Sequence, residues 1–174
     1  MEKKLTAIDL FSGAGGLHLG FEESGYDVKL CIDNNDLVEK THKRNFPHIP
    51  MINGDIRDVT ADQIREYLNG ESLDVIIGGP PCQGFSTIGH RASSDPNKRY
   101  AHDARNELVL VYANLIKELR PKFIVMENVK GILTLDKGAY LENVMKTLHE
   151  AGYNAEYRLI NMADYGVPEI RNRV

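Results

Sequence analysis

The sequence has few cysteines, no tryptophan and no long apolar run. Two cysteines, Cys31 and Cys82, in 174 residues are too few for a disulfide framework, and their spacing is not that of a zinc site, so no metal is expected. No apolar run approaches the roughly 18 residues that cross a bilayer, and no long apolar signal region opens the chain. We therefore expect an intracellular protein without a membrane partner.

An overall excess of basic charge is also missing. The formal net charge of -4 and the pI near 5.9 argue mildly against a nucleic-acid partner, because duplex-binding proteins usually show a basic footprint. Basic residues are locally enriched between residues 86 and 105, where four lysines and arginines outnumber two aspartates. With 42% hydrophobic and 26% charged residues, the composition fits one globular domain.

Strand-like and helix-like segments alternate from the first residues onward, which is typical of a mostly parallel sheet with helices on both faces. The expected strands are residues 5–11, 27–32, 51–53, 73–78, 122–126 and 153–161. The expected helices are residues 16–24, a segment that Asn35 or Asp36 caps and that runs to about Asn45, residues 61–68 behind a Thr60/Gln63 capping box, residues 108–119, and a last helix around residues 141–148.

A glycine-rich turn at residues 11–16 follows the first strand and opens a helix, which lets backbone approach a ligand at the positive end of that helix. Its spacing disfavours a nicotinamide cofactor, because His18 occupies the sixth position of the dinucleotide fingerprint. Asp33 ends the second strand, where an acid can hydrogen-bond ribose hydroxyls, and Asp55 follows the third. The alternative role for each aspartate is to cap a turn.

The segment at residues 80–86 is the most specific functional signal in the sequence. It places the Cys82 thiol on a stiff turn just past the carboxyl end of a buried strand, where open α/β folds have their active sites. Cys31, inside a strand, is interpreted as a small core residue. Glu127 follows the next strand, so a carboxyl and a thiol are expected at adjacent strand ends, which favours acid-assisted covalent catalysis. The alternative is that the Glu127 carboxylate is structural and pairs with the amino terminus of a nearby helix.

Four segments, residues 9–16, 80–83, 127–129 and 171–173, resemble in order the motifs of the cytosine-5 DNA methyltransferase family, and the resemblance covers about Leu5 to Val174. It implies the S-adenosylmethionine-dependent methyltransferase fold, an α/β architecture with a Rossmann-like, mostly parallel sheet. Residues 1–174 would form the catalytic and cofactor-binding domain, cut before the last strand of the family's sheet. The target-recognition region of the family would not be present.

The same resemblance implies a role for each motif residue. Cys82 would be the nucleophile and Glu127 the acid, while Arg171 and Arg173 would support the flipped base and its phosphates. Glu169 stands where the family usually has glutamine. The residues implied for the cofactor S-adenosylmethionine are Phe11, Ser12, Gly13, Gly15, Gly16, Asp33, Asn34, Asp55, Ile56, Pro80 and Leu108. Those implied for DNA are Gln83, Ser86, Arg91 and Arg99.

The implied reaction is methyl transfer from S-adenosylmethionine to carbon 5 of a flipped cytosine, which leaves S-adenosylhomocysteine. The implied partners are double-stranded DNA and a complementing C-terminal segment or subunit, in a bacterial cytoplasmic or nucleoid-associated restriction-modification setting. Two other functions remain open, namely a transfer-RNA cytosine methyltransferase and a non-catalytic cofactor-binding subunit. An amino-group methyltransferase is disfavoured, because its usual Pro-Pro-aromatic turn is here Pro-Pro-Cys.

Overall fold

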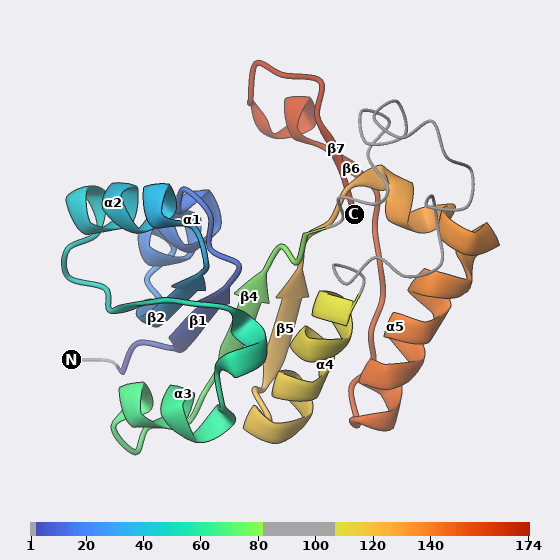
Figure 1. The fold of residues 1–174 in the computed structure, drawn as a ribbon. Helices are drawn as coiled ribbons and strands as arrows, with labels where there is room; N and C mark the ends of the chain where they lie inside the picture. The colour runs from blue at the N-terminus through green and yellow to red at the C-terminus, as the bar shows by residue number, and fades with distance from the viewer. Residues whose placement is uncertain (1–2, 82–106) are drawn as a thin grey trace. The chain divides into compact units, whose positions relative to one another are not determined.

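The computed structural model describes residues 3–81 and 107–174, and the backbone divides into two compact units (Figure 1). The first unit holds Met1–Pro80 and Asn114–Met126, and the second holds Pro81–Ala113 and Glu127–Val174. The predictions for Cys82, Gln83, Ser86, Arg91 and Arg99 lie outside the described residues. Within the described ranges, no helix has the length and apolar character to cross a membrane.

The first unit is built on a five-stranded parallel sheet with the order β3-β2-β1-β4-β5. Its strands are β1 (Thr6–Leu10), β2 (Asp27–Asp33), β3 (Met51–Asn53), β4 (Val75–Gly78) and β5 (Phe123–Met126). Its helices are α1 (Gly16–Glu23), α2 (Asp36–Asn45) and α3 (Ala61–Leu68), with the C-terminal half of α4 (Glu107–Leu119) and a 3-10 turn, η1 (Ile56–Asp58).

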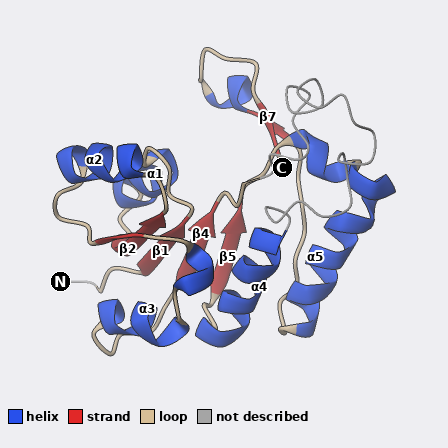
Figure 2. Cartoon of the chain, viewed as in Figure 1, coloured by secondary structure: helices blue, strands red, loops and turns tan. Residues whose placement is uncertain are grey.

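The strand order explains how the helices cover this sheet. From β1 the chain moves outward through β2 to β3, then returns past β1 to β4 and β5, and right-handed crossovers therefore put α1 and α2 on one face and α3 on the other. Figure 2 shows this arrangement. Every carboxyl end of the parallel strands lies at one edge of the sheet, and the glycine-rich turn, Asp33 and Asp55 follow the strands there.

Local sequence sets the ends of these elements as predicted. The Asn35 side chain caps α2 by accepting from the Leu37 N–H, and Thr60 with Gln63 forms the capping box of α3. Gly25 ends α1 at a φ of 91°, the left-handed conformation that glycine adopts without strain. The core lies between the sheet and its helices, and all five residues of β1 are buried.

The second unit contains the N-terminal half of α4, the helix α5 and several short elements. After α4 its elements are the 3-10 turns η4 (Lys130–Leu133) and η5 (Leu135–Gly138), α5 (Ala139–Glu150), β6 (Ile160–Asn161), η6 (Met162–Tyr165) and β7 (Asn172–Arg173). Along one face of α5, Leu141, Val144 and Leu148 are buried, as the helical spacing predicts. Strands β6 and β7 form a separate antiparallel pair.

Two predictions about strands are wrong. Residues 122–126 were expected to be a buried strand, but β5 is the edge strand of the described sheet, and Phe123 is 69% exposed. Residues 153–161 were expected to be one long strand. Only Ile160–Asn161 is a strand, and β7 pairs with it. Residues 153–159 pair with no strand of the described chain, and an extended segment becomes a strand only where another backbone pairs with it.

Candidate functional site

The glycine-rich turn after β1 has a tightly constrained backbone. Phe11 takes a φ of 64°, which is unusual for a bulky side chain and costs about 1–3 kcal/mol, and Gly13 and Gly15 also have positive φ. The Ser12 N–H donates to the Ile32 carbonyl at 3.0 Å, and the Gly15 N–H donates to the Ser12 carbonyl at 3.1 Å. The turn is thereby fixed to the end of β2 before α1 begins at Gly16.

Asp33 joins three parts of the carboxyl edge of the sheet. Its Oδ2 accepts from the Gly13 N–H at 2.9 Å, its Oδ1 accepts from the Asn35 N–H at 3.1 Å, and its carbonyl accepts from the Gly54 N–H at 2.9 Å. The structure thus brings Asp33 and the glycine-rich turn together, as the prediction of one shared site requires. Asn34, beside it, is exposed.

Asp55 has a partner that the sequence reasoning missed. Both of its carboxylate oxygens contact the Arg57 guanidinium, and its Oδ1 also accepts from the Arg57 N–H at 2.9 Å. These hydrogen bonds from Arg57 lower the pKa of Asp55 to about 2. Asp55 is therefore an anion that also caps a 3-10 turn, in which Ile56 is buried. The Asp-x-Arg spacing was the available signal for this ion pair.

The last two predicted cofactor residues fall in different units. Pro80 is buried and ends the first part of the first unit, whereas Leu108 is half-buried on the N-terminal half of α4, in the second unit. The contribution of Leu108 to the cofactor site stays a prediction.

Glu127 meets Arg173 in the second unit. The Nε atom of Arg173 lies 2.6 Å from Oε1 of Glu127, with side-chain exposures of 16% and 39% respectively. Backbone pairing sets this contact, because the Asn128 N–H donates to the Val174 carbonyl at 2.7 Å and the Val174 N–H donates to the Asn128 carbonyl at 2.9 Å. The contact is an ion pair without hydrogen-bond geometry at Nε. A carboxylate and an arginine from distant motifs are thus held side by side.

Arg171 behaves differently from Arg173. Its side chain is 45% exposed and lies 4.0 Å from the Glu169 carboxylate, the residue that replaces the glutamine of the implied motif. An exposed ion pair of this kind contributes little to stability, so Arg171 stays available for an anionic ligand. The structure does not bring Arg171 to Glu127.

Comparison with known proteins gives one consistent result. Residues 5–174 match the family model of the C-5 cytosine-specific DNA methylases. The type II methyltransferase M.XorII of Xanthomonas oryzae is 42% identical over 96% of this chain and 38% of its own length. The type II methyltransferase M.AquIA of a Picosynechococcus strain is 40% identical, over 100% of this chain and 71% of its own length.

Two solved structures share the fold. An E. coli prophage protein described as a DNA modification methyltransferase superposes with a TM-score of 0.81 at 34% identity, over 98% of this chain and 45% of that one. Spodoptera frugiperda DNMT2 superposes with a TM-score of 0.72 at 28% identity, over 98% of this chain and 48% of that one. The chain thus spans less than half the length of these two proteins and of M.XorII.

Proposed function

Because the chain belongs to the family of C-5 cytosine-specific DNA methylases, we propose that residues 1–174 form the catalytic and cofactor-binding domain of a DNA cytosine-5 methyltransferase, with S-adenosylmethionine as methyl donor and Cys82 as nucleophile. The observation that carries the proposal is the contact between Glu127 and Arg173. Two motifs that are far apart in the sequence, each implied to be catalytic, converge on one carboxylate.

The first unit offers a site that fits the cofactor. The Ser12 hydroxyl is buried without a hydrogen-bond partner among the described residues, which leaves a polar atom for a ligand. Beyond the adjoining backbone, no atom of the described residues lies within 4 Å of a Cβ built on Gly13 or on Gly16, so there is open space beside the turn. Asp33 and Asp55 supply carboxylates for ribose and adenine groups, and Phe11 supplies an aromatic ring, half-buried at the same turn.

When bound, S-adenosylmethionine supplies an electrophilic methyl group on a sulfonium. The chain's residues have to make carbon 5 of cytosine nucleophilic, and the Cys82 thiolate does so by bonding to carbon 6. The Glu127 carboxyl delivers a proton at ring nitrogen 3, where negative charge develops. After carbon 5 has gained its methyl group, loss of the proton from carbon 5 and release of the thiolate restore the aromatic ring.

Arg173 is a positioning residue in this scheme. It holds the Glu127 carboxylate by charge, and the backbone pairing of Asn128 with Val174 holds Arg173 in place. The target base has to leave the stacked duplex to reach these groups. We propose Gln83, Ser86, Arg91 and Arg99 as DNA contacts near Cys82, and the exposed Arg171 as a phosphate contact.

We further propose that sequence-specific methylation needs a recognition region outside residues 1–174, on the same or on a separate polypeptide. The chain covers only 38% of M.XorII. Its second unit also exposes several large apolar side chains, and exposed apolar patches mark interaction surfaces. These side chains are Tyr157, Leu159, Tyr165, Val167 and Ile170.

The test of the proposed function is the Cys82→Ser variant of the complete protein. It should lose methyl transfer to duplex DNA while S-adenosylmethionine binding stays nearly unchanged, because the proposed cofactor contacts are untouched. The wild type should form a covalent complex with a duplex that carries 5-fluorocytosine. A variant that methylates DNA at the wild-type rate would remove Cys82 from the mechanism. Parallel assays with transfer RNA separate the second substrate class, and retained cofactor binding without methylation of either substrate would favour a non-catalytic subunit.

A further inference from the structure

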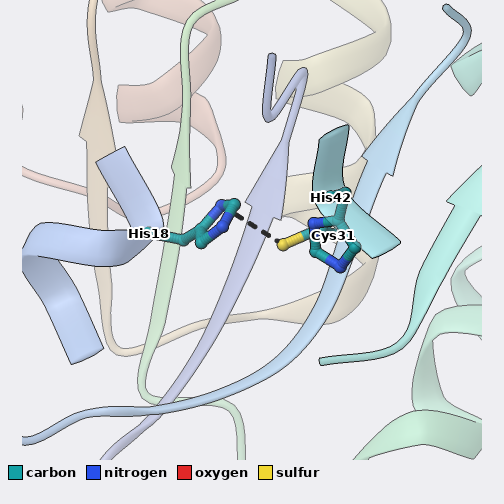
Figure 3. Close-up of side chains that lie close together, drawn as sticks. All are labelled: His18, Cys31 and His42. Carbon is teal, nitrogen blue, oxygen red and sulfur yellow. Dashed lines mark hydrogen bonds between the residues drawn. The ribbon is translucent and has the colours of Figure 1, made fainter. Parts of the chain in front are cut away.

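Three buried side chains of the first unit gather where α1, β2 and α2 meet. They are His18, Cys31 and His42, and one nitrogen or sulfur atom of each lies within 4.8 Å of the corresponding atoms of the other two. Figure 3 shows the His18 ring and the Cys31 thiol pointing toward each other, with Sγ 3.4 Å from Nδ1. Imidazole and thiol groups are the side chains that bind Zn²⁺ most often in proteins.

His42 is prepared to act as a ligand. Its Nε2 lies 2.8 Å from the Ile49 carbonyl oxygen, and a carbonyl can only accept, so the hydrogen is on Nε2. The Nδ1 atom therefore keeps its lone pair, yet it is buried and has no hydrogen-bond partner among the described residues. A histidine that donates one N–H to a backbone carbonyl and turns its other nitrogen to a metal is the usual arrangement at zinc sites.

Asp9, on β1, adds a carboxylate. Its Oδ2 lies 3.0 Å from Nδ1 of His18, whereas its buried Oδ1 has no partner within the described part of the chain. The Asp9 carboxyl and the Cys31 thiol are both fully buried. A divalent cation would balance the charge of one thiolate and one carboxylate in this interior.

The geometry suits a small tetrahedral ion. Three atoms within 4.8 Å of one another leave a cation at their centre about 2.8 Å or less from each, against about 2.0–2.3 Å in a formed zinc site. To bind the ion at zinc distances, each ligand atom would therefore have to move by less than about an ångström. Phe46 packs edge-on against the His18 ring at a centroid distance of 4.5 Å, which keeps water from one side of the cluster.

We propose that His18, Cys31 and His42 form a buried structural site for Zn²⁺, with the Asp9 carboxylate beside the His18 ring as a neighbouring charge. The site would join α1, β2 and α2 beneath the glycine-rich turn. It is separate from the proposed methyl transfer, since none of its ligands has a role in that reaction. It was not expected from the sequence, because its three ligands come from three elements without a metal-binding spacing.

The test is metal binding by the complete protein. The protein is unfolded in denaturant that contains a chelator and is then refolded with Co²⁺ or Zn²⁺, because a fully buried site is filled most readily during folding. A Cys82→Ser background leaves Cys31 as the only thiol of residues 1–174. We expect one metal per chain, a thiolate-to-cobalt charge-transfer band, tetrahedral cobalt absorption and a higher thermal midpoint with Zn²⁺ than without. Cys31→Ser should abolish the charge-transfer band, and His42→Gln should weaken binding by more than roughly a hundredfold, since outer-shell changes alone cost 10–100-fold.

His48→Gln is the matched control, because His48 is an exposed histidine that pairs with Glu22 at 2.8 Å and should keep full metal binding when replaced. Failure of the refolded parent protein to bind stoichiometric metal would overturn the proposal without reference to any variant. A charge-transfer band that survives in Cys31→Ser would overturn it as well. Neither result depends on catalytic activity, so the zinc site and the proposed function are tested independently.

Discussion

The Nε atom of Arg173 lies 2.6 Å from Oε1 of Glu127, although the first residue belongs to β7 and the second directly follows β5 in the chain. Arg173 is the more buried of the two, with 16% of its side chain exposed. The reciprocal backbone hydrogen bonds of Asn128 and Val174 bring the two segments together, so the position of the carboxylate depends on residues outside the predicted catalytic set.

This contact predicts coupled effects on turnover. We expect Arg173→Ala to lower kcat about a hundredfold with little change in S-adenosylmethionine affinity, a loss within the range of general acid-base effects. Glu127→Gln should act similarly, because it keeps a hydrogen bond but loses the transferable proton. In a protein that already carries Glu127→Gln, adding Arg173→Ala should cost less than about tenfold, as expected for two residues that act through one contact.

Single-turnover methylation with all four proteins measures this coupling, and Arg158→Ala, an exposed arginine of the same unit, is the control that should behave like wild type. Additive losses in the double variant would mean that Arg173 does not act through Glu127.

Substitution of the neighbouring glycines Gly15 and Gly16 should have different effects on stability. A Cβ on Gly15 would lie 2.5 Å from the Phe46 ring and 2.8 Å from the His18 ring, and the φ of Gly15 is 98°. Gly15→Ala should therefore destabilise the protein by several kcal/mol, through strain and overpacking together. On Gly16 nothing lies within 4 Å of a Cβ, so Gly16→Ala should change stability by less than about 1 kcal/mol. Denaturant unfolding compares the two, and equal stabilities would show that the turn is not packed as described.

Local signals account for most of the predicted fold. The Asn35 cap and the Thr60/Gln63 capping box use residues within one turn of each other, so the sequence alone was enough to place the starts of α2 and α3. Apolar runs likewise predicted the strands β1 and β4. For the site, positions at strand ends placed Asp33 near the glycine-rich turn, and the Gly13–Asp33 hydrogen bond shows that the two lie side by side, while their role in cofactor binding stays a prediction.

What could not be predicted depends on long-range contacts. Burial of a strand is set by what packs over it, and no local pattern reports that Phe123 is exposed on an edge strand. The pairing of Asn128 with Val174 joins segments with no common sequence signal. The His18, Cys31 and His42 cluster depends on the packing of two helices against one strand, and the sequence spacing of these residues gave no indication of it.

Asp33 and Asp55, the two aspartates proposed to bind the cofactor, have different hydrogen-bond partners, so their variants should differ in effect. Asp33→Ala should weaken S-adenosylmethionine binding about 10–100-fold, because it removes a charged acceptor and also the anchor of the Gly13 N–H. Asp55→Ala should weaken binding about tenfold through loss of its contact to the adenine. Arg57→Ala leaves the Asp55 carboxylate in place and should change affinity by less than about threefold. Calorimetry on the complete protein measures all three, and an equal loss in Asp55→Ala and Arg57→Ala would assign Asp55 a purely structural role.

The last prediction concerns acid stability and rests on Asp74. This buried carboxylate accepts from the Thr6 N–H at 2.8 Å and contacts Nζ of Lys122 at 2.6 Å, and these bonds, led by that from Lys122, lower its pKa from 3.8. A lowered pKa in the folded state means that the stabilisation is present above about pH 4 and is lost as the pH falls through the folded-state value. Asp74→Asn should therefore destabilise the protein by about 1–3 kcal/mol at pH 7, since its amide turns a donor toward Thr6 or Lys122. As the pH falls below the ordinary aspartate pKa of 3.8 and through the lowered folded-state value, the difference from wild type should shrink toward zero. Asp62→Asn, at an 89% exposed aspartate, should show neither effect, and urea unfolding between pH 2.5 and 7 checks all three proteins. A destabilisation of Asp74→Asn that stays constant across this range would show that the charge of Asp74 does not stabilise the fold.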